Sequence, residues 1–255
     1  MPEKTIFVFL EYKESESWCG KEILSGGSML WAGHNILQTL GNDGHNWDEI
    51  FIVEFSDKNI YNTAQESLAE EKKIKNYKII PINPYPKAQM DKMNKRLIGF
   101  VNSAIDTTLG LDIRETMTET HLDFRRESLE LMLQRDKKLP FVMVVFNRFL
   151  DIAAYPDDYK GEKKTTGREA YKLYGRVVVQ YQGKFGAQMP FAGNVSSTVV
   201  GDEDWDDFVL IRYRSNVEFE KTFTPKLIQG ISELHRHASL ESTKGYAVTP
   251  REDFM

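Results

Sequence analysis

The first third of the chain carries apolar segments separated by turn residues, a pattern that predicts strands and helices in alternation. Four β-branched or aromatic segments predict strands over residues 5–12, 29–40, 47–55 and 77–82. Capping residues and helical spacing predict helices over residues 15–24 and 59–73. The turn sequence 41–44 separates the second and third strands. The predicted order is β-α-β-β-α-β.

The last part of the chain predicts the same order again. Its strands are expected over residues 141–149, 191–200, 205–213 and 246–249. A helix should follow Thr166 and end at Gly183, because apolar residues recur there at helical spacing. Pro225 cannot lie inside a helix, so Thr224 is expected to cap a new helix with a buried stripe between Leu227 and Ala238.

Helices should connect these two parts. Apolar residues recur every three or four positions over residues 90–109, and Gly110 follows as a C-terminal cap. A second, highly charged helix is expected over residues 114–137. The predicted organisation is a first unit at residues 1–86, a helical connector at 87–138 and a second unit at 139–255.

Two sequence blocks recur in order, which indicates that the units are diverged copies. Residues 29–34 read MLWAGH and residues 47–55 read WDEIFIVEF. Their counterparts at 189–194 and 205–213 read MPFAGN and WDDFVLIRY. A chain built from two copies of one unit predicts a structure with pseudo-twofold symmetry.

The order β-α-β-β-α-β predicts a ferredoxin-like unit, and the fold class is therefore α+β. Its strands are apolar on both faces: Phe51, Val53 and Phe55 lie on one side, and Ile50 and Ile52 on the other. Helices cover one face of such a sheet, so the other face needs a second sheet. Two facing sheets make an α/β barrel, closed either within a monomer as an internal pseudo-dimer or between the chains of a homodimer.

Composition narrows the functional classes. The 255 residues carry a net charge of −5 and no basic stripe, which argues against a nucleic-acid partner. The apolar runs are too short to span a membrane, and the chain enters a strand-like segment without a signal peptide. The single cysteine, Cys19, excludes an internal disulfide and a Cys-rich zinc site. A reduced, cytoplasmic protein is expected.

The second copy resembles an uncharacterised bacterial branch of the dimeric α/β-barrel superfamily. The motifs that carry this resemblance are Asn147-Arg148-Phe149, Ala154-Tyr155-Pro156, Thr166-Gly167-Arg168-Glu169-Ala170-Tyr171, Tyr174-Gly175, Trp205-Asp206, Arg212-Tyr213-Arg214-Ser215, His235-Arg236-His237-Ala238 and Thr249-Pro250. Arg214 stands where the family pattern has proline. The resemblance implies a barrel of two sheets. It implies little about activity, because the superfamily holds cofactor-free oxygenases, isomerases and haem proteins.

The repeated blocks contain the first candidate site residues. Gly33 and Gly193 predict either a bulge or a close approach of backbone or ligand. His34 would then be a proton shuttle or a polar rim residue, and Asn194 stands at the matched position. Asp206, like Asp48, either accepts backbone N–H bonds beside a tryptophan that closes the barrel end or acts as a general base.

Charged and tyrosine side chains of the strands and the helix are further candidates. Glu54 and Arg212 occupy matched strand positions and predict either an ion pair across the two sheets or a polar pocket wall. Arg212 or Arg148 would stabilise an oxyanion, and a tyrosine or His34 would move a proton. Three tyrosines are expected to line the pocket or to pack with a wet hydroxyl: Tyr155, Tyr171 and Tyr174.

Three functions are compatible with these residues. The first is a protein that binds a small organic molecule without a tightly held cofactor; as an enzyme it would transfer protons or add oxygen to an aromatic or keto substrate. The second is a non-catalytic binding or interaction module. The third is a haem protein with His235 as axial ligand, which only the position within the resembling fold suggests. No residue pattern indicates a metal site, because His235 and His237 lie on different helix faces.

Overall fold

The computed structural model describes residues 4–14, 20–24, 26–113, 120–161, 164–196, 200 and 204–254, with residues 35, 232 and 233 described by their backbone alone. Cys19 and most of the helix predicted over residues 15–24 lie outside the described residues. The predicted division of the chain after residues 86 and 138 stays a prediction.

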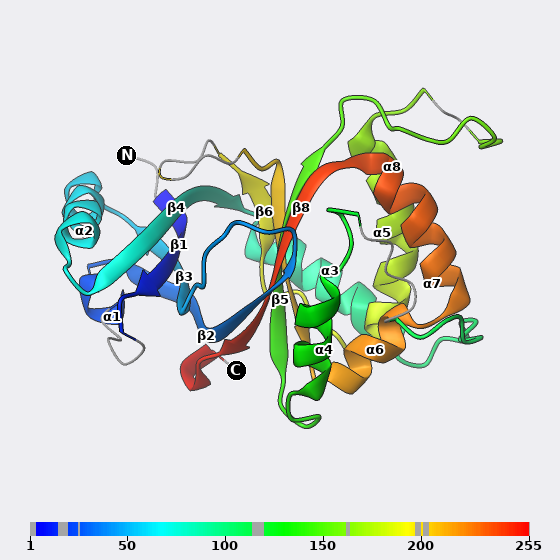
Figure 1. Cartoon of the computed structure of the whole chain (residues 1–255), viewed down its shortest axis with the longest axis horizontal. Coiled ribbons are helices and arrows are strands. Elements are labelled where there is room, and N and C mark those ends of the chain that lie inside the picture. Colours follow the sequence, from blue (N-terminus) through cyan, green and yellow to red (C-terminus); the bar gives the residue numbers. More distant parts are fainter. Residues whose placement is uncertain are drawn as a thin grey trace.

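The described strands form one closed antiparallel barrel within a single chain (Figure 1). Their order around the barrel is β1-β3-β2-β8-β5-β7-β6-β4. The strands are β1 (Lys4–Tyr12), β2 (Ser28–Leu40), β3 (Glu49–Phe55), β4 (Ile74–Pro84), β5 (Phe141–Phe149), β6 (Ala192–Val195), β7 (Asp207–Tyr213) and β8 (Leu240–Pro250). Strands β1–β4 come from the first part of the chain and β5–β8 from the second. These two groups meet at two seams, β2 with β8 and β4 with β6.

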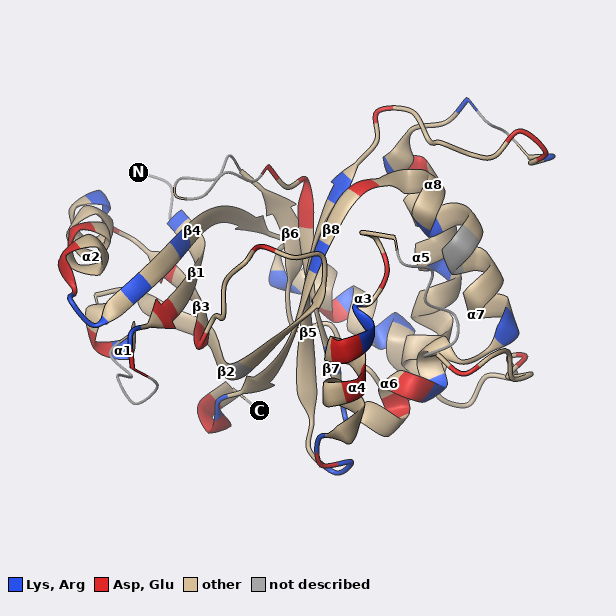
Figure 2. Cartoon of the chain, in the orientation of Figure 1, with Lys and Arg blue, Asp and Glu red and all other residues tan. Residues whose placement is uncertain are grey.

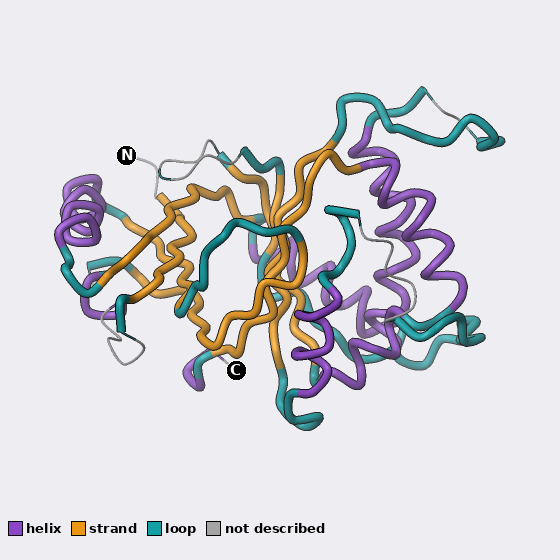
Figure 3. Tube along the Cα trace, viewed as in Figure 1, coloured by secondary structure: helices purple, strands orange, loops and turns teal. Residues whose placement is uncertain are grey.

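Helices cover the outside of the barrel at its two sides. Figures 1 and 3 show α1 and α2 on one side, and most of the helical chain gathered on the other. The helices are α1 (Gly20–Ile23), α2 (Lys58–Glu70), α3 (Lys87–Gly99), α4 (Arg126–Gln134), α5 (Gly167–Lys184), α6 (Asn216–Phe223), α7 (Lys226–Ile231) and α8 (His237–Ser239). A π-helical turn, η1 (Ser232–Arg236), joins α7 to α8, and a 3₁₀ turn, η2 (Glu252–Phe254), follows β8.

The barrel interior is an apolar core to which both halves of the chain contribute. Phe7 of β1 packs edge-on against Phe146 of β5 and Phe208 of β7, with ring centroids 5.1 Å apart in each pair. Ile50 and Ile52 of β3 belong to the same cluster. Because residues of neighbouring and opposite strands meet here, the interior is filled by side chains and is not a ligand channel.

The outer face of the first four strands is a second core. Phe51, Val53 and Phe55 pack there with Tyr61 and Leu68 of α2. The prediction that these strands are buried on both faces is confirmed: in β3, Ile50 and Ile52 face the barrel interior, and Phe51, Val53 and Phe55 face the helices.

One end of the barrel interior carries a buried polar cluster around Asp43. Its Oδ2 accepts hydrogen bonds from Trp47 Nε1 at 2.9 Å and Tyr246 Oη at 2.7 Å. Lys78 Nζ and Lys244 Nζ lie 3.5 and 4.0 Å from the same oxygen. The predicted tryptophan at the barrel end is therefore held by a carboxylate that two ammonium groups surround.

The repeated glycines lie at the two seams. Gly33 of β2 pairs with Pro250 of β8, and Gly193 of β6 pairs with Pro84 of β4. A Cβ atom on Gly33 would crowd Val248, and one on Gly193 would collide with the Asn83 carbonyl oxygen. Neither glycine has a positive φ. Close approach of the neighbouring strand, and not backbone conformation, requires glycine here.

The connector differs from its prediction. The helix expected over residues 90–109 ends at Gly99, because Gly110 N donates to Thr224 O at 3.0 Å and Leu109 pairs with Pro225. Of the helix expected over residues 114–137, residues 114–119 lie outside the described part, and within residues 120–137 the helix is α4, which begins after Arg125, whose backbone N donates to Thr39 O of β2 at 2.8 Å. In both places the backbone pairs with a distant segment, which a helical pattern does not reveal.

The boundaries near β6 and β8 also differ. The strand expected over residues 191–200 is the short β6, and residues 197–199 lie outside the described part. The final strand, expected over residues 246–249, is β8 and begins at Leu240. This strand pairs with β5 from Leu240 to Val248.

Charge is distributed evenly over the described elements. Figure 2 shows basic and acidic positions interspersed along helices, strands and loops. None of the described helices is long and apolar enough to cross a membrane.

The seam predicts a specific sensitivity. Gly193→Ala should destabilise the protein by about 1–3 kcal/mol, because the added Cβ forces β6 away from β4. Chemical denaturation measures the change in the free energy of unfolding. Gly99→Ala is the control: its Cβ would meet no atom within 4 Å, so no loss is expected. Equal stability of Gly193→Ala and the wild type would contradict the seam argument.

Candidate functional site

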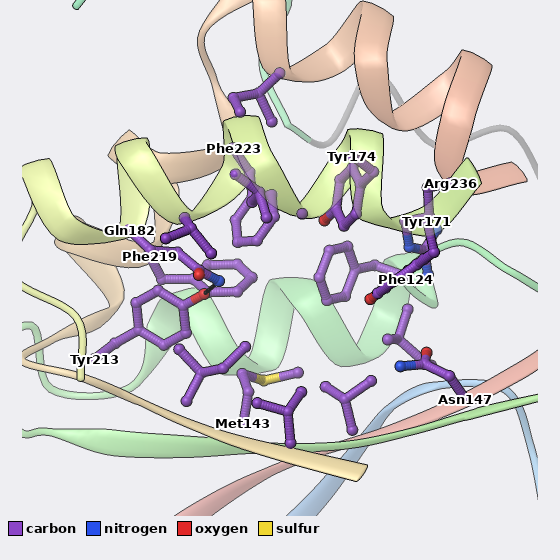
Figure 4. Close-up of a pocket in the computed structure, with 18 of the residues that line it drawn as sticks. Phe124, Met143, Asn147, Tyr171, Tyr174, Gln182, Tyr213, Phe219, Phe223 and Arg236 are labelled. Atoms are coloured by element: carbon purple, nitrogen blue, oxygen red, sulfur yellow. Dashed lines mark hydrogen bonds between the residues drawn. The ribbon is translucent and has the colours of Figure 1, made fainter. Parts of the chain in front are cut away.

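A cavity of about 960 Å³ lies between α5 and the outer face of β5 and β7. The helix contributes one face of side chains, and the strands contribute Met143, Val145, Val209 and Ile211. Most of the lining is aliphatic or aromatic. Figure 4 shows Tyr174 and Phe124 in the middle of this space. The helix residues that line the cavity are Tyr171, Tyr174, Gly175, Val178, Val179 and Gln182.

The position of α5 is fixed at both ends. Thr166 caps its N-terminus, accepting from Glu169 N at 3.2 Å while the Glu169 side chain accepts from Thr166 N. Near the other end, Gly183 approaches the Leu97 backbone of α3 so closely that a Cβ atom would collide with it. The helix is therefore held rigidly above the sheet, and the tyrosines and glutamine on its inner face have defined positions.

A carboxylate and an amide form one polar end of the cavity. Asn147 Nδ2 of β5 donates to Asp207 Oδ1 of β7 at 3.1 Å. Thr243 Oγ1 of β8 donates to Asn147 Oδ1 at 3.0 Å, which fixes the orientation of the amide. The three side chains form a directed chain of hydrogen bonds that ends on Asp207, whose side chain is 21% exposed.

Burial raises the pKa of Asp207 to about 6, with the nearby Asp206 carboxylate acting in the same direction. The hydrogen bond from Asn147 and the Arg168 guanidinium, 3.5 Å away, lower it in part. A carboxyl group with a pKa close to neutral pH is suited to accept and release a proton.

Tyr171 and Arg236 lie beside Asn147 at this end of the cavity (Figure 4). Burial raises the pKa of Tyr171 far above its usual value, so its hydroxyl keeps its proton. Arg236 comes from the π-helical turn η1 and donates to the backbone oxygen of Leu122. Its Nη1 is 3.8 Å from Asp123 Oδ1. This end therefore combines a carboxylate with neutral and cationic hydrogen-bond donors.

The opposite end of the cavity holds Gln182 and Tyr213, next to Phe219 (Figure 4). Gln182 Nε2 donates to Tyr213 Oη at 3.2 Å, and both side chains are buried. Burial raises the pKa of Tyr213 well above its usual value, and its hydroxyl is therefore neutral.

The first half of the chain contains the counterpart of Asp207 but closes it off. Glu49 follows Trp47-Asp48 as Asp207 follows Trp205-Asp206. Its carboxylate accepts from Tyr12 Oη and pairs with Arg251, and Glu49 is fully buried. Burial raises the pKa of Glu49, against the opposing effects of Tyr12 and Arg251. The equivalent carboxylate is therefore structural in one half and faces a cavity in the other.

Two of the predicted site residues, Tyr171 and Tyr174, line the cavity, and the others do not. Asp206 Oδ2 accepts from Phe149 N at 2.7 Å, and Asp48 Oδ2 accepts from Tyr12 N at 2.7 Å. These matched bonds are the predicted structural role of the repeated aspartate.

The remaining predicted residues lie elsewhere on the barrel. Arg148 Nε pairs with Glu241 Oε2 at 2.9 Å, and both side chains are about half exposed. His34 of β2 faces Glu49 and Thr249 of the neighbouring strands. Its pKa is lowered by burial and by two arginines. Asn194 pairs with Asn83 at the seam.

The predicted ion pair between Glu54 and Arg212 is wrong for the described structure. Glu54 lies on β3 and Arg212 on β7, and three strands separate them in either direction around the barrel. The described residues contain no ion pair between them. Arg212 also lies outside the cavity lining, because even residues of β7 face the barrel interior.

The cavity does not fit the hypothesis of a haem with His235 as axial ligand. His235 is not part of the lining, and its Nδ1 is 2.7 Å from Tyr155 Oη. His237 is the one histidine in the described lining, and its Nε2 is 2.7 Å from Asp123 Oδ1. No three His, Cys, Asp or Glu side chains of the described residues are grouped to hold a metal ion.

Sequence reasoning missed the residues that make both ends of the cavity polar. Asp207 is the second carboxylate of the repeated block, and Glu49 stands at the matched position of the other block. Because a one-residue step changes the face of a strand, the second carboxylate had to point to the side opposite Asp206, and this was a signal for Asp207. Asn147 and Arg236 belonged to motifs that carry the family resemblance. Tyr213 belonged to such a motif too, but nothing in the sequence paired it with Gln182, because only packing brings the helix end to the strand end.

No protein-family model matches the chain, and no curated protein sequence matches it. Among solved structures, a protein of unknown function from Rhodopseudomonas palustris is 26% identical with a TM-score of 0.45, over 50% of this chain and 95% of that one. A monooxygenase candidate from Lactobacillus acidophilus is 11% identical with a TM-score of 0.41, over 97% and 93%. Chlorite dismutase from Candidatus Nitrospira defluvii in complex with imidazole is 10% identical with a TM-score of 0.40, over 99% and 93%. TM-scores this low say nothing about activity, and the cavity is the feature of this protein that bears on its function.

The pKa of Asp207 predicts a pH-dependent effect of Asp207→Asn. The pKa is about 6 in the folded protein against 3.8 as the ordinary value, so ionisation of Asp207 costs folding free energy. The free energy of unfolding of the wild type therefore falls as the pH rises from about 3.8 to about 6, and Asp207 causes no further fall above that pH. The variant cannot ionise there, so its stability relative to the wild type should increase by about 1 kcal/mol between about pH 5 and pH 8.

Denaturant unfolding at the two pH values measures this difference. Asp151→Asn is the control, because it makes the same substitution at an exposed position outside the cavity lining, and its stability relative to the wild type should show no such increase. A constant difference between Asp207→Asn and the wild type would contradict a raised pKa.

Proposed function

We propose that this protein binds a small, largely apolar organic molecule in the cavity under α5 and transfers a proton on it. The observation that carries the proposal is a cavity of about 960 Å³ lined by aromatic and aliphatic side chains and bordered by a carboxyl group whose pKa is about 6. A cavity of this size suits a molecule of two or three fused rings or a comparable chain.

Asp207 acts as the base in this proposal. Near neutral pH its carboxylate is mostly ionised and takes a proton from a carbon next to a carbonyl group. The electron pair of that C–H bond moves to the carbonyl oxygen and forms an enolate. Tyr171 and Arg236 at the same end donate hydrogen bonds to this oxygen. Return of the proton from Asp207 to the enolate oxygen, and not to the carbon that lost it, completes a keto–enol isomerisation.

The resemblance of the second copy to the dimeric α/β-barrel superfamily supports an enzyme of this kind, because cofactor-free isomerases and oxygenases occur there. The tyrosines of the sequence hypothesis, Tyr171 and Tyr174, keep their place in the pocket. Asp207 replaces His34, Arg148 and Arg212 as the proposed reacting residue, since those three lie outside the lining. Assembly as a monomer and a cytoplasmic location are part of the same proposal.

Occupation of the cavity is the first prediction. Native mass spectrometry of the purified protein should show bound apolar compounds, and Val179→Trp should weaken this binding, because the indole occupies part of the cavity. Leu173→Trp adds a comparable volume on the same helix at a position 37% exposed and outside the lining, and should keep it. Equal binding by both variants would place the ligand elsewhere.

Proton transfer is the second prediction. The protein should accelerate deuterium exchange at the methyl carbon of 2-acetonaphthone, followed by NMR, and kcat/KM should rise with pH up to about pH 6 and then level off. Asp207→Asn should lower it at least about a hundredfold and leave binding intact. Asp151→Asn, at an exposed position outside the lining, is the control with the same charge change and should behave as the wild type. Binding without any exchange would instead indicate the non-catalytic module.

A further inference from the structure

The Gln182–Tyr213 end of the cavity has hydrogen-bonding groups left to offer. Gln182 is 2% exposed and Tyr213 is 1% exposed. The amide nitrogen of Gln182 donates to the tyrosine oxygen at 3.2 Å. Among the described residues, Gln182 Oε1 has no hydrogen-bond partner, although it is buried. The tyrosine accepts in this bond, so its own O–H remains able to donate to another group.

The tyrosine ring that carries this hydroxyl is held in place by its neighbours. Phe141 stacks on the Tyr213 ring at 5.4 Å between centroids, and Phe219 packs edge-on at 5.1 Å. Gln182 comes from the C-terminal part of α5, which the close contact of Gly183 with α3 fixes. The acceptor and the donor are therefore preorganised side by side at one end of the cavity (Figure 4).

A buried acceptor without a partner is unfavourable, and a ligand that supplies the missing donor gains accordingly. We infer that the Gln182–Tyr213 pair recognises an uncharged amide-type group of the ligand, whose N–H donates to Gln182 Oε1 while its carbonyl oxygen accepts from Tyr213 Oη. Carboxamides, lactams and related ring amides carry this donor beside an acceptor.

An ionised carboxylate does not fit this end. It would place a negative oxygen against Gln182 Oε1 and has no donor to offer it. The cationic lining residue Arg236 lies at the other end, beside Tyr171, and is engaged with Asp123 (Figure 4). Lys226, another cationic residue of the lining, is exposed to solvent and does not balance a carboxylate at the Gln182–Tyr213 end.

This inference rests on the proposed function and adds the substrate class and its orientation. The amide-type group is anchored between Gln182 and Tyr213, the apolar middle of the molecule lies beside Tyr174 and Phe124, and the carbon that loses a proton lies near Asp207. The two polar ends of the cavity differ in character: one is neutral and paired, and the other is acid–base active.

Three probes that share the naphthalene ring test the inference: 2-naphthamide, methyl 2-naphthoate and 2-naphthoate, with dissociation constants from fluorescence titration at neutral pH. The wild type should bind the amide about tenfold more tightly than the ester, because the ester leaves Gln182 Oε1 without a donor. The carboxylate should bind most weakly. Gln182→Leu should weaken amide binding about tenfold and leave ester binding unchanged.

Two further variants complete the test. Tyr213→Phe removes only the hydroxyl and should also reduce the preference for the amide. Gln180→Leu makes the same substitution two residues away, where the side chain bonds to the backbone of its own helix, and should behave as the wild type. Equal affinity of the wild type for amide and ester, or a preference that survives both Gln182→Leu and Tyr213→Phe, would overturn the inference. Absence of binding for all three probes would overturn the proposed function itself.

Discussion

Closure of the barrel at two seams is the constraint on which the rest of the structure depends. Gly33 against Pro250 and Gly193 against Pro84 allow β2 to reach β8 and β6 to reach β4. With both seams closed, the interior is a sealed core of aromatic and aliphatic side chains. A ligand therefore has to bind on an outer face of the sheet, under a helix, and the architecture limits where function can arise.

The two halves of the chain use that outer face differently. In the first half, Tyr12 and Arg251 occupy the carboxylate of Glu49, and α2 packs directly on the strands. In the second half, α5 stands over a cavity and the matched Asp207 borders it. The matched carboxylate is thus engaged inside the protein in the first half, whereas in the second half it has a raised pKa and borders the cavity.

The cavity combines an apolar middle with polar groups at both ends. Burial raises the pKa of Asp207 to about 6, and the same burial leaves Gln182 Oε1 without a partner among the described residues. The low polarity around these side chains therefore accounts for both the raised pKa of Asp207 and the unfavourable position of the unpaired Gln182 oxygen. These side chains, and not the fold, limit the chemistry that the cavity can support, because the fold by itself is compatible with many reactions.

The sequence by itself determined the strands, the helices α2 and α5, the repeated blocks and the burial of strands on two faces, because periodicity and turn residues are local properties. It also brought Tyr171 and Tyr174 to the pocket, since helical spacing places them on one face. The tertiary structure alone decided three things: that the barrel closes within one chain, that the connector pairs with β2 and with residues 224–226, and that Asp207 and not Asp206 borders the cavity. Each of these depends on which distant segment lies opposite, and a one-residue step in a strand reverses the face.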